Sequence, residues 1–329
     1  MSLIHHEGSV GVFDYDDRMF ELLGGVLHLR KGYEGPIDLP KGVTSCWKMF
    51  LRCDLTNCYL RDFDTSSVTN MSHMFYECKL PEGFTLGEKF VTSNVTNMVC
   101  MFARCRLPEG FTLGDEFNTS KVTDMTEMFE RCELPDGFVL GDKFDTSSVI
   151  DMSGMFSKCV LSEGFTLGDM FDTSSVENME SMFHDCTLPR GFTLGDKFDT
   201  HRVSSMAHMF DKCTFSEGFT LGDKFDTSSV HYMSGMFYEC KLPEGFILGS
   251  KFNAHDTASV RDMFYQCQLN GDYLEGDTPS IINQLKVGGA ASCVDPCEEV
   301  FKVVLNIPLA SIKNCDTNEE VVELIKRYM

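Results

Sequence analysis

Apolar residues recur along this chain at one fixed spacing. The string Met-Phe-x-x-Cys occurs nine times, and after a first gap of 25 residues each of its phenylalanines follows the previous one by 27. Self-similarity at a fixed period of this length is typical of stacked repeat architectures. We therefore predict an N-terminal cap over residues 1–42, a solenoid of about nine units over residues 43–269, and a C-terminal cap over residues 270–329.

Within one unit the apolar residues fall three or four positions apart, as on one face of an α-helix. One such set is Val122, Met125, Met128, Phe129, Cys132 and Leu134. The preceding Asp-Thr-Ser-Ser, residues 145–148 in another unit, offers side-chain oxygens that would cap the first turn of a helix. Leu-Pro-Glu-Gly, as at residues 80–83, would end it.

The rest of each unit alternates between apolar and polar positions. Phe84 and Leu86 flank Thr85, which predicts a short half-buried strand that ends at Gly87. Strands of neighbouring units would pair in parallel, and the right-handed crossover rule fixes the hand. The predicted fold class is thus an α/β solenoid: a right-handed, leucine-rich-repeat-like stack with a parallel β-sheet on one face and short helices on the other.

The two ends depart from the repeat. Residues 9–15 and 25–29 read as strands that cover the first unit. Residues 279–287, 295–305 and 317–329 read as three helices of a C-terminal cap.

The repeat Phe-Asp-Thr-Ser-Ser-Val-x-x-Met-x-x-Met-Phe-x-x-Cys resembles that of the BspA-like surface-protein family, relatives of the leucine-rich repeats. The resemblance covers about residues 43–269. It implies a leucine-rich-repeat-like solenoid without catalysis, with roles in adhesion or protein binding at bacterial, protist or large-virus surfaces. The family defines no catalytic or ligand residues, so none carry over.

The net charge of the chain disfavours two classes of binding partner. The formal net charge is −22, which disfavours nucleic acid and anionic membrane surfaces. No segment has the apolar length of a membrane span, and we recognise no signal peptide. We expect a cytoplasmic or virion- or assembly-associated protein; a cell-surface location stays open if an export signal preceded residue 1.

Nine cysteines share one position of the repeat and would form a column inside the stack. Side chains in a ladder point the same way, so we expect buried free thiols rather than disulfides. The column consists of Cys53, Cys78, Cys105, Cys132, Cys159, Cys186, Cys213, Cys240 and Cys267. Cys293 and Cys297 form a lone C-x-x-x-C, which is weak evidence for a metal site.

Other candidate chemistry is sparse. An acidic column would stack carboxylates in neighbouring units and attract calcium, but each acid can equally be a solvated corner residue, offset in four units by the lysine that follows it. The column is Glu88, Asp115, Asp142, Asp169, Asp196 and Asp223.

The histidines have no recurrent Ser, Cys or Asp partner that spacing would place nearby, and no phosphate-binding glycine loop is present. We predict no catalytic, cofactor-binding or metal-binding residues.

Recognition is expected where the units differ from one another. The positions between the core residues of the predicted helix vary and should face solvent. The predicted strand instead carries a nearly uniform threonine ladder, which could also dock a ligand. The ladder is Thr85, Thr112, Val139, Thr166, Thr193, Thr220 and Ile247. Exposed positions can vary simply because packing does not constrain them. If the helix face binds, its candidate partner-contact residues are Tyr76, His231, Tyr232, Tyr238 and Tyr265.

These patterns favour a non-enzymatic scaffold that binds other proteins or associates with itself, for example within a surface layer or virus particle. The alternative is a calcium-dependent, carbohydrate-binding or host-cell adhesin.

Overall fold

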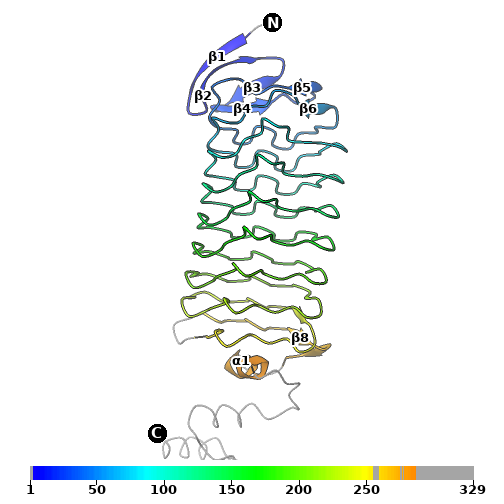
Figure 1. Cartoon of the computed structure of the whole chain (residues 1–329), viewed down its shortest axis with the longest axis vertical. Coiled ribbons are helices and arrows are strands. Elements are labelled where there is room, and N and C mark those ends of the chain that lie inside the picture. Colours follow the sequence, from blue (N-terminus) through cyan, green and yellow to red (C-terminus); the bar gives the residue numbers. More distant parts are fainter. Residues whose placement is uncertain (1–2, 255–258, 275, 277, 287–329) are drawn as a thin grey trace, which may run out of the picture.

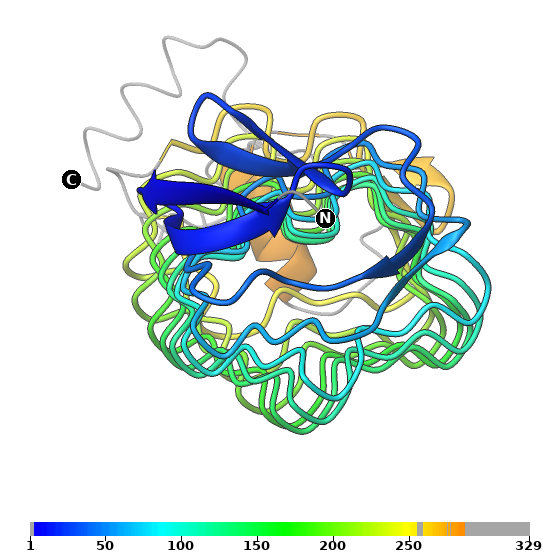
Figure 2. The same cartoon turned by 90° about the horizontal axis from the view of Figure 1, so that it is seen from above.

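The computed structural model describes residues 3–254, 259–274, 276 and 278–286 of the chain. Coils of one repeat each are stacked along the long axis of the molecule, between a β-rich N-terminal end and a C-terminal helix (Figure 1). Seen along that axis, successive coils superpose closely (Figure 2). The predicted helices over residues 295–305 and 317–329, and the Cys293 and Cys297 pair, lie outside the described residues.

Two antiparallel hairpins form the N-terminal end. One joins β1 (Leu3–Gly8) to β2 (Gly11–Asp16), and the other joins β3 (Phe20–Leu23) to β4 (Val26–Leu29). The predicted strands over residues 9–15 and 25–29 correspond to β2 and β4. Their partners β1 and β3 were missed, because neither shows a clear apolar alternation. β5 (Gly35–Ile37) then pairs in parallel with β6 (Cys58–Leu60).

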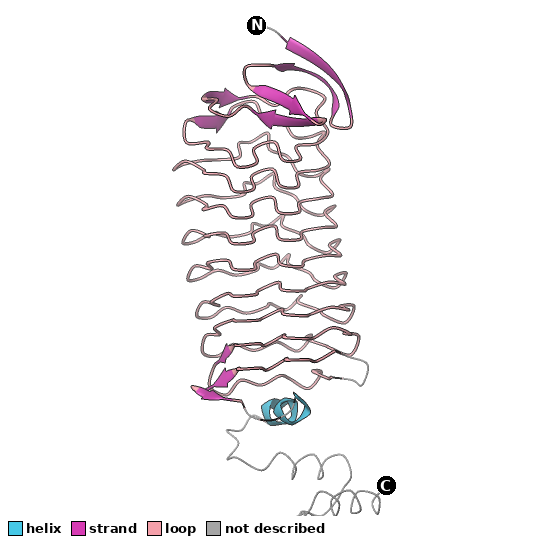
Figure 3. Ribbon diagram, turned by 180° about the vertical axis from the view of Figure 1, so that it is seen from behind, coloured by secondary structure: helices cyan, strands magenta, loops and turns pink. Residues whose placement is uncertain are grey.

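The C-terminal end carries the one helix of the described residues. Strands β7 (Lys241–Leu242), β8 (Gln268–Leu269) and β9 (Asp272–Tyr273) form a small sheet there. Helix α1 (Thr278–Lys286) follows, close to the helix predicted over residues 279–287. It buries Ile281, Ile282 and Leu285 and lies below the last coil (Figure 3). The apolar end of the stack is thereby covered.

The helix predicted in each unit is wrong. Residues 68–78 form consecutive turns, with Met74 N–H donating to Met71 C=O at 3.1 Å and Cys78 N–H donating to Phe75 C=O at 3.1 Å. Between these turns, alternate N–H groups donate to the next coil, as from Phe75 to Met101 C=O at 2.9 Å. A chain of four-residue turns returns to the interior every three or four residues, so it produces the same apolar spacing as a helix.

The turns depend on left-handed backbone at two positions of every coil, two residues before and two residues after the core phenylalanine. Sixteen of these eighteen positions carry a side chain, and the other two are Gly154 and Gly235. A turn with positive φ at its third residue normally favours glycine, because a Cβ atom crowds the neighbouring carbonyl. Packing and hydrogen bonds between the coils hold these residues in a backbone conformation that is unfavourable for them in an isolated chain.

Lys212 tests this strain, because its side chain is exposed and its φ is 61°; the equivalent residues of the other coils have φ values from 52° to 61°. We expect Lys212→Gly to stabilise the protein by about 0.5–1 kcal/mol, since glycine removes the left-handed penalty. Lys224 is exposed without positive φ, and Lys224→Gly should destabilise by about 0.5–1 kcal/mol. Urea midpoints of the two variants would show opposite signs; a loss of stability in both would contradict the strain.

The predicted parallel β-sheet is wrong as well. Phe84 and Leu86 are buried and Thr85 is exposed, so the predicted alternation is confirmed. However, no backbone hydrogen bond joins residues 84–87 to residues 111–114 of the next coil, both within the described part. The coils meet there through side chains, with the Phe84 and Phe111 rings stacked at 6.5 Å.

Parallel pairing occurs instead as isolated bridges in two columns. One column passes through Asn70, Asn97 and Asp124, and the other through Lys79, Arg106 and Glu133. Successive coils are thus joined at the spacing of adjacent strands, about 4.8 Å. The right-handed, leucine-rich-repeat-like class stays a prediction.

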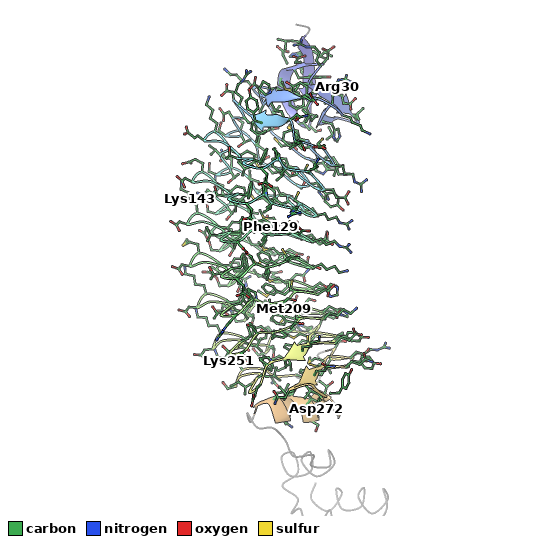
Figure 4. The ribbon with its side chains drawn as sticks, turned by 90° about the vertical axis from the view of Figure 1, so that its right-hand side faces the viewer. Arg30, Phe129, Lys143, Met209, Lys251 and Asp272 are labelled. Atoms are coloured by element: carbon green, nitrogen blue, oxygen red, sulfur yellow. The ribbon has the colours of Figure 1, made fainter. Side chains whose placement is uncertain are left out.

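Columns of identical residues fill the core. Phe102, Phe129 and Phe156 lie in one stack with ring centroids 5.8 Å apart, and all three are fully buried. Figure 4 shows Phe129 and Met209 within the stack and Lys143 at its outer edge. Each coil buries its apolar face against the coils above and below it, which no isolated unit could do.

A column of buried threonines also joins the coils. The Thr173 hydroxyl donates to Asp199 C=O at 2.8 Å and accepts from Asp199 N–H at 2.7 Å. The predicted helix-capping role of Asp-Thr-Ser-Ser is therefore wrong for the threonine, since there is no helix to cap. The column is Thr65, Thr92, Thr119, Thr146, Thr173, Thr200 and Thr227, each with no exposed surface.

Candidate binding surface

The turn segments present a different set of side chains on each coil. In residues 176–186 the side chains of Val176, Met179 and Met182 point into the core. The intervening residues lie on the outer surface. We call these outward positions of all coils the coil-specific surface. The positions in this coil are Glu177, Asn178, Glu180, Ser181, His184 and Asp185.

The prediction that these positions face solvent is only partly confirmed. Glu177 and Glu180 are exposed, but Ser72, which is equivalent to Glu180, and Gly235, which is equivalent to Ser181, are buried. Coils that lie one strand spacing apart shield one another, so a small residue between larger neighbours is covered. Periodicity within one coil could not show this effect.

The structure brings only one pair of the predicted contact residues together. The rings of Tyr238 and Tyr265 stack at 5.2 Å on neighbouring coils, and Tyr265 is exposed. Tyr76 is half-buried, because the Arg104 guanidinium lies 5.5 Å above its ring. Tyr232 is 59% exposed, and the neighbouring His231 is exposed too.

Tyr232 forms one wall of a groove that sequence reasoning missed. The groove has a volume of about 470 Å³ and crosses four successive coils. Its residues occupy equivalent positions of those coils, so the groove follows the axis of the stack. It is lined by Ile150, Asp151, Glu177, Asn178, Glu180, Ser204, Ser205, Ala207 and Tyr232.

Local sequence explains the hollow. One coil carries small side chains at all three of its lining positions, Ser204, Ser205 and Ala207. The coil before it carries Glu177 and Glu180 at the corresponding positions. A run of small residues at coil-specific positions was the available signal, but it has meaning only once neighbouring coils are known to lie in register.

The threonine ladder and the acidic column lie on another part of the surface. Thr112, Asp115 and Asp142 are exposed. The predicted offset of these acids by the following lysine is wrong in two of the four units, since Lys143 pairs with Glu116 of the preceding coil at 3.3 Å and Lys89 pairs with Asp62. Within the described ranges, no three His, Cys, Asp or Glu side chains converge as metal ligands.

A family model described as "Mycoplasma protein of unknown function, DUF285" matches residues 40–134, 112–188 and 162–276 in three overlapping stretches. The chain belongs to this family. No curated protein and no solved structure matches it. In the described part of this DUF285 protein, no helix has the length and apolar character to span a membrane.

The expectation that no acidic partner lies near the histidines is wrong at three places in the described part of this family member: His5 lies 2.7 Å from Asp14, His201 lies 2.8 Å from Asp199, and two histidines lie beside Asp211. The Asp211 carboxylate is buried and accepts a hydrogen bond from His208 at 3.0 Å, with His184 of the preceding coil at 3.4 Å. Burial lowers the pKa of His184. The Cys186 thiol donates to the backbone carbonyl of His184 at 3.9 Å, but among the described residues no cysteine or serine side chain is hydrogen-bonded to the two imidazole rings or to the Asp211 carboxylate.

The predicted column of free thiols is confirmed for the cysteines inside the stack. Twelve cysteines of the described residues are free, and only Cys53 among them is half-buried. Six of the inner thiols donate to the core phenylalanine carbonyl of the preceding coil, as from Cys186 to Phe156 at 2.9 Å. Burial raises the pKa of Cys105 and Cys186 to about 12 and that of Cys53 to about 11.

Alkylation should reflect this burial. At pH 8 we expect iodoacetamide to label Cys53 before Cys105 and Cys186 and to leave those two unmodified in the folded protein, because a thiol with a pKa raised by about three units has about a thousandfold less thiolate. Peptide mass spectrometry with and without urea would measure this. Equal labelling of Cys186 in both conditions would contradict a closed stack.

Proposed function

We propose that this DUF285 protein is a non-enzymatic scaffold of BspA-like repeats that binds other proteins through the coil-specific surface. The observation that carries the proposal is the contrast between a repeated backbone and side chains that differ on every coil. Such an arrangement lets one rigid platform present many distinct contacts.

The rigidity of the platform has an identified source. Backbone N–H groups of one coil donate to the next at 2.8–3.0 Å along residues 71, 73 and 75, and the buried threonine and cysteine side chains add further bonds between coils. A preorganised surface loses little conformational entropy when it binds, which favours affinity.

The exposed side chains suit protein recognition. Tyrosine supplies a large contact area at a low entropic cost and is enriched where interfaces gain most of their energy. Tyr232 and Tyr265 are each at least half exposed, and Tyr265 stacks on Tyr238. The threonine ladder, by contrast, repeats the same short side chain and offers no such anchors.

Site-specific photo-cross-linking in the native source tests this function. A photoreactive phenylalanine in place of Tyr232 should give a discrete adduct with one other protein, whereas the same residue in place of Thr193, on the threonine ladder, should not. The absence of an adduct at Tyr232, or identical adducts from both positions, would contradict the proposal.

A further inference from the structure

The groove on the coil-specific surface has a defined chemical character. Tyr232 at one end is 59% exposed and Ile150 at the other is 46% exposed, so both offer apolar surface to a ligand. The floor between them consists of small side chains. A chain segment lying along the axis of the stack would therefore contact one apolar wall at each end.

Carboxylates line the side of the groove, and they are incompletely neutralised. Glu177 lies 3.7 Å from Arg202, at the long limit of an ion pair, and both side chains are more than half exposed. Glu180 forms no ion pair with any residue that the structure describes. The third acid is already engaged, because Asp151 accepts hydrogen bonds from Ser153 and from Asn178.

An arginine side chain complements this arrangement better than other groups do. Its guanidinium can form charge-assisted bonds to Glu177 and Glu180, and its planar face can lie against an aromatic ring such as Tyr232. Arginine and tyrosine are also the residues that recur at the energetic centres of interfaces.

We infer that the groove docks an arginine-bearing, extended segment of a partner protein, with the guanidinium between Glu177 and Glu180 and beside Tyr232. This inference rests on the proposed function, since it names the partner chemistry for one part of the same surface.

Fluorescence anisotropy with a defined probe tests the docking. The probe is the fluorescein-labelled peptide Gly-Ser-Arg-Gly-Arg-Ser-Gly, and its control carries citrulline, a neutral isostere, at both arginine positions. We expect saturable binding of the arginine peptide to the full chain, and a loss of affinity of about tenfold or more for the double variant Glu177→Gln with Glu180→Gln.

The net charge of the chain would attract any cationic peptide, so the control variant must change charge equally. Asp169→Asn with Asp196→Asn removes two exposed carboxylates of the acidic column, outside the groove. It should leave the affinity within about twofold, while Tyr232→Ala should weaken binding several-fold. Melting temperatures of all variants should match, because each altered side chain lies on the surface.

Equal losses in the two double variants, or equal binding of the citrulline peptide, would overturn the inference. Those outcomes would leave the photo-cross-linking result unchanged, so a wrong ligand class can be told from a wrong function.

Discussion

Phe156→Ala should destabilise the protein by about 3–5 kcal/mol, because it leaves a large cavity in the phenylalanine column. The Phe156 ring is fully buried, and it stacks on Phe129 at 5.8 Å and on Phe183 at 5.7 Å. The Phe156 ring also packs edge to face against the Phe165 ring, with the two ring centroids 5.7 Å apart. One truncation therefore removes packing from three coils.

Urea denaturation followed by circular dichroism would measure this loss. Phe156→Leu should cost clearly less than the alanine variant, since it fills most of the cavity. Val160→Ala is a surface control, because Val160 is 60% exposed, and it should change stability by less than about 0.5 kcal/mol. If Phe156→Ala lowered the free energy of unfolding by less than about 1 kcal/mol, the phenylalanine column would not be a main source of core stability.

Thr173→Val should cost about 2–4 kcal/mol, although it preserves the shape of the side chain. The hydroxyl of Thr173 both donates to and accepts from the backbone of Asp199, so valine leaves two polar groups unpaired in a poorly hydrated site. Each such group costs about 1–3 kcal/mol when its partner is removed.

The threonine ladder supplies the matched control for this prediction. Thr193 is exposed, and the equivalent positions of other coils already hold Val139 and Ile247. Thr193→Val should therefore leave the urea midpoint almost unchanged. Similar costs for the two variants would mean that the buried threonine column does not hold the coils together.

The period and the buried columns could be predicted from sequence, because repetition itself reveals which positions are constant. Phe129, Met128 and Cys132 are buried as the spacing implies. The local backbone could not be predicted from that spacing, because consecutive four-residue turns and an α-helix both return to the core every three or four residues. Only the inter-coil bonds, which join residues 26 apart in sequence, distinguish them.

The buried threonine could have been found by internal comparison. A helix cap accepts Ser, Asp or Asn as readily as Thr, yet seven successive units keep Thr at the position of Thr173 and the last unit departs, with Ala254, while Asp172 becomes Val91 or Asn118 elsewhere. A threonine that is kept in seven successive units indicates that both its methyl and its hydroxyl are needed. The groove could not have been found this way, since it depends on which side chains lie above and below one another.

The functional account predicts that recognition can be removed without altering the scaffold. Glu177→Thr with Glu180→Ser gives one coil the residues that Thr69 and Ser72 already supply on another coil of the same backbone. The most direct measurement compares the amount of the Tyr232 cross-linked adduct in this double variant and in the unaltered chain, with the melting temperature of each. The account predicts loss of the adduct at an unchanged melting temperature; an undiminished adduct would show that the side chains specific to this coil do not select the partner.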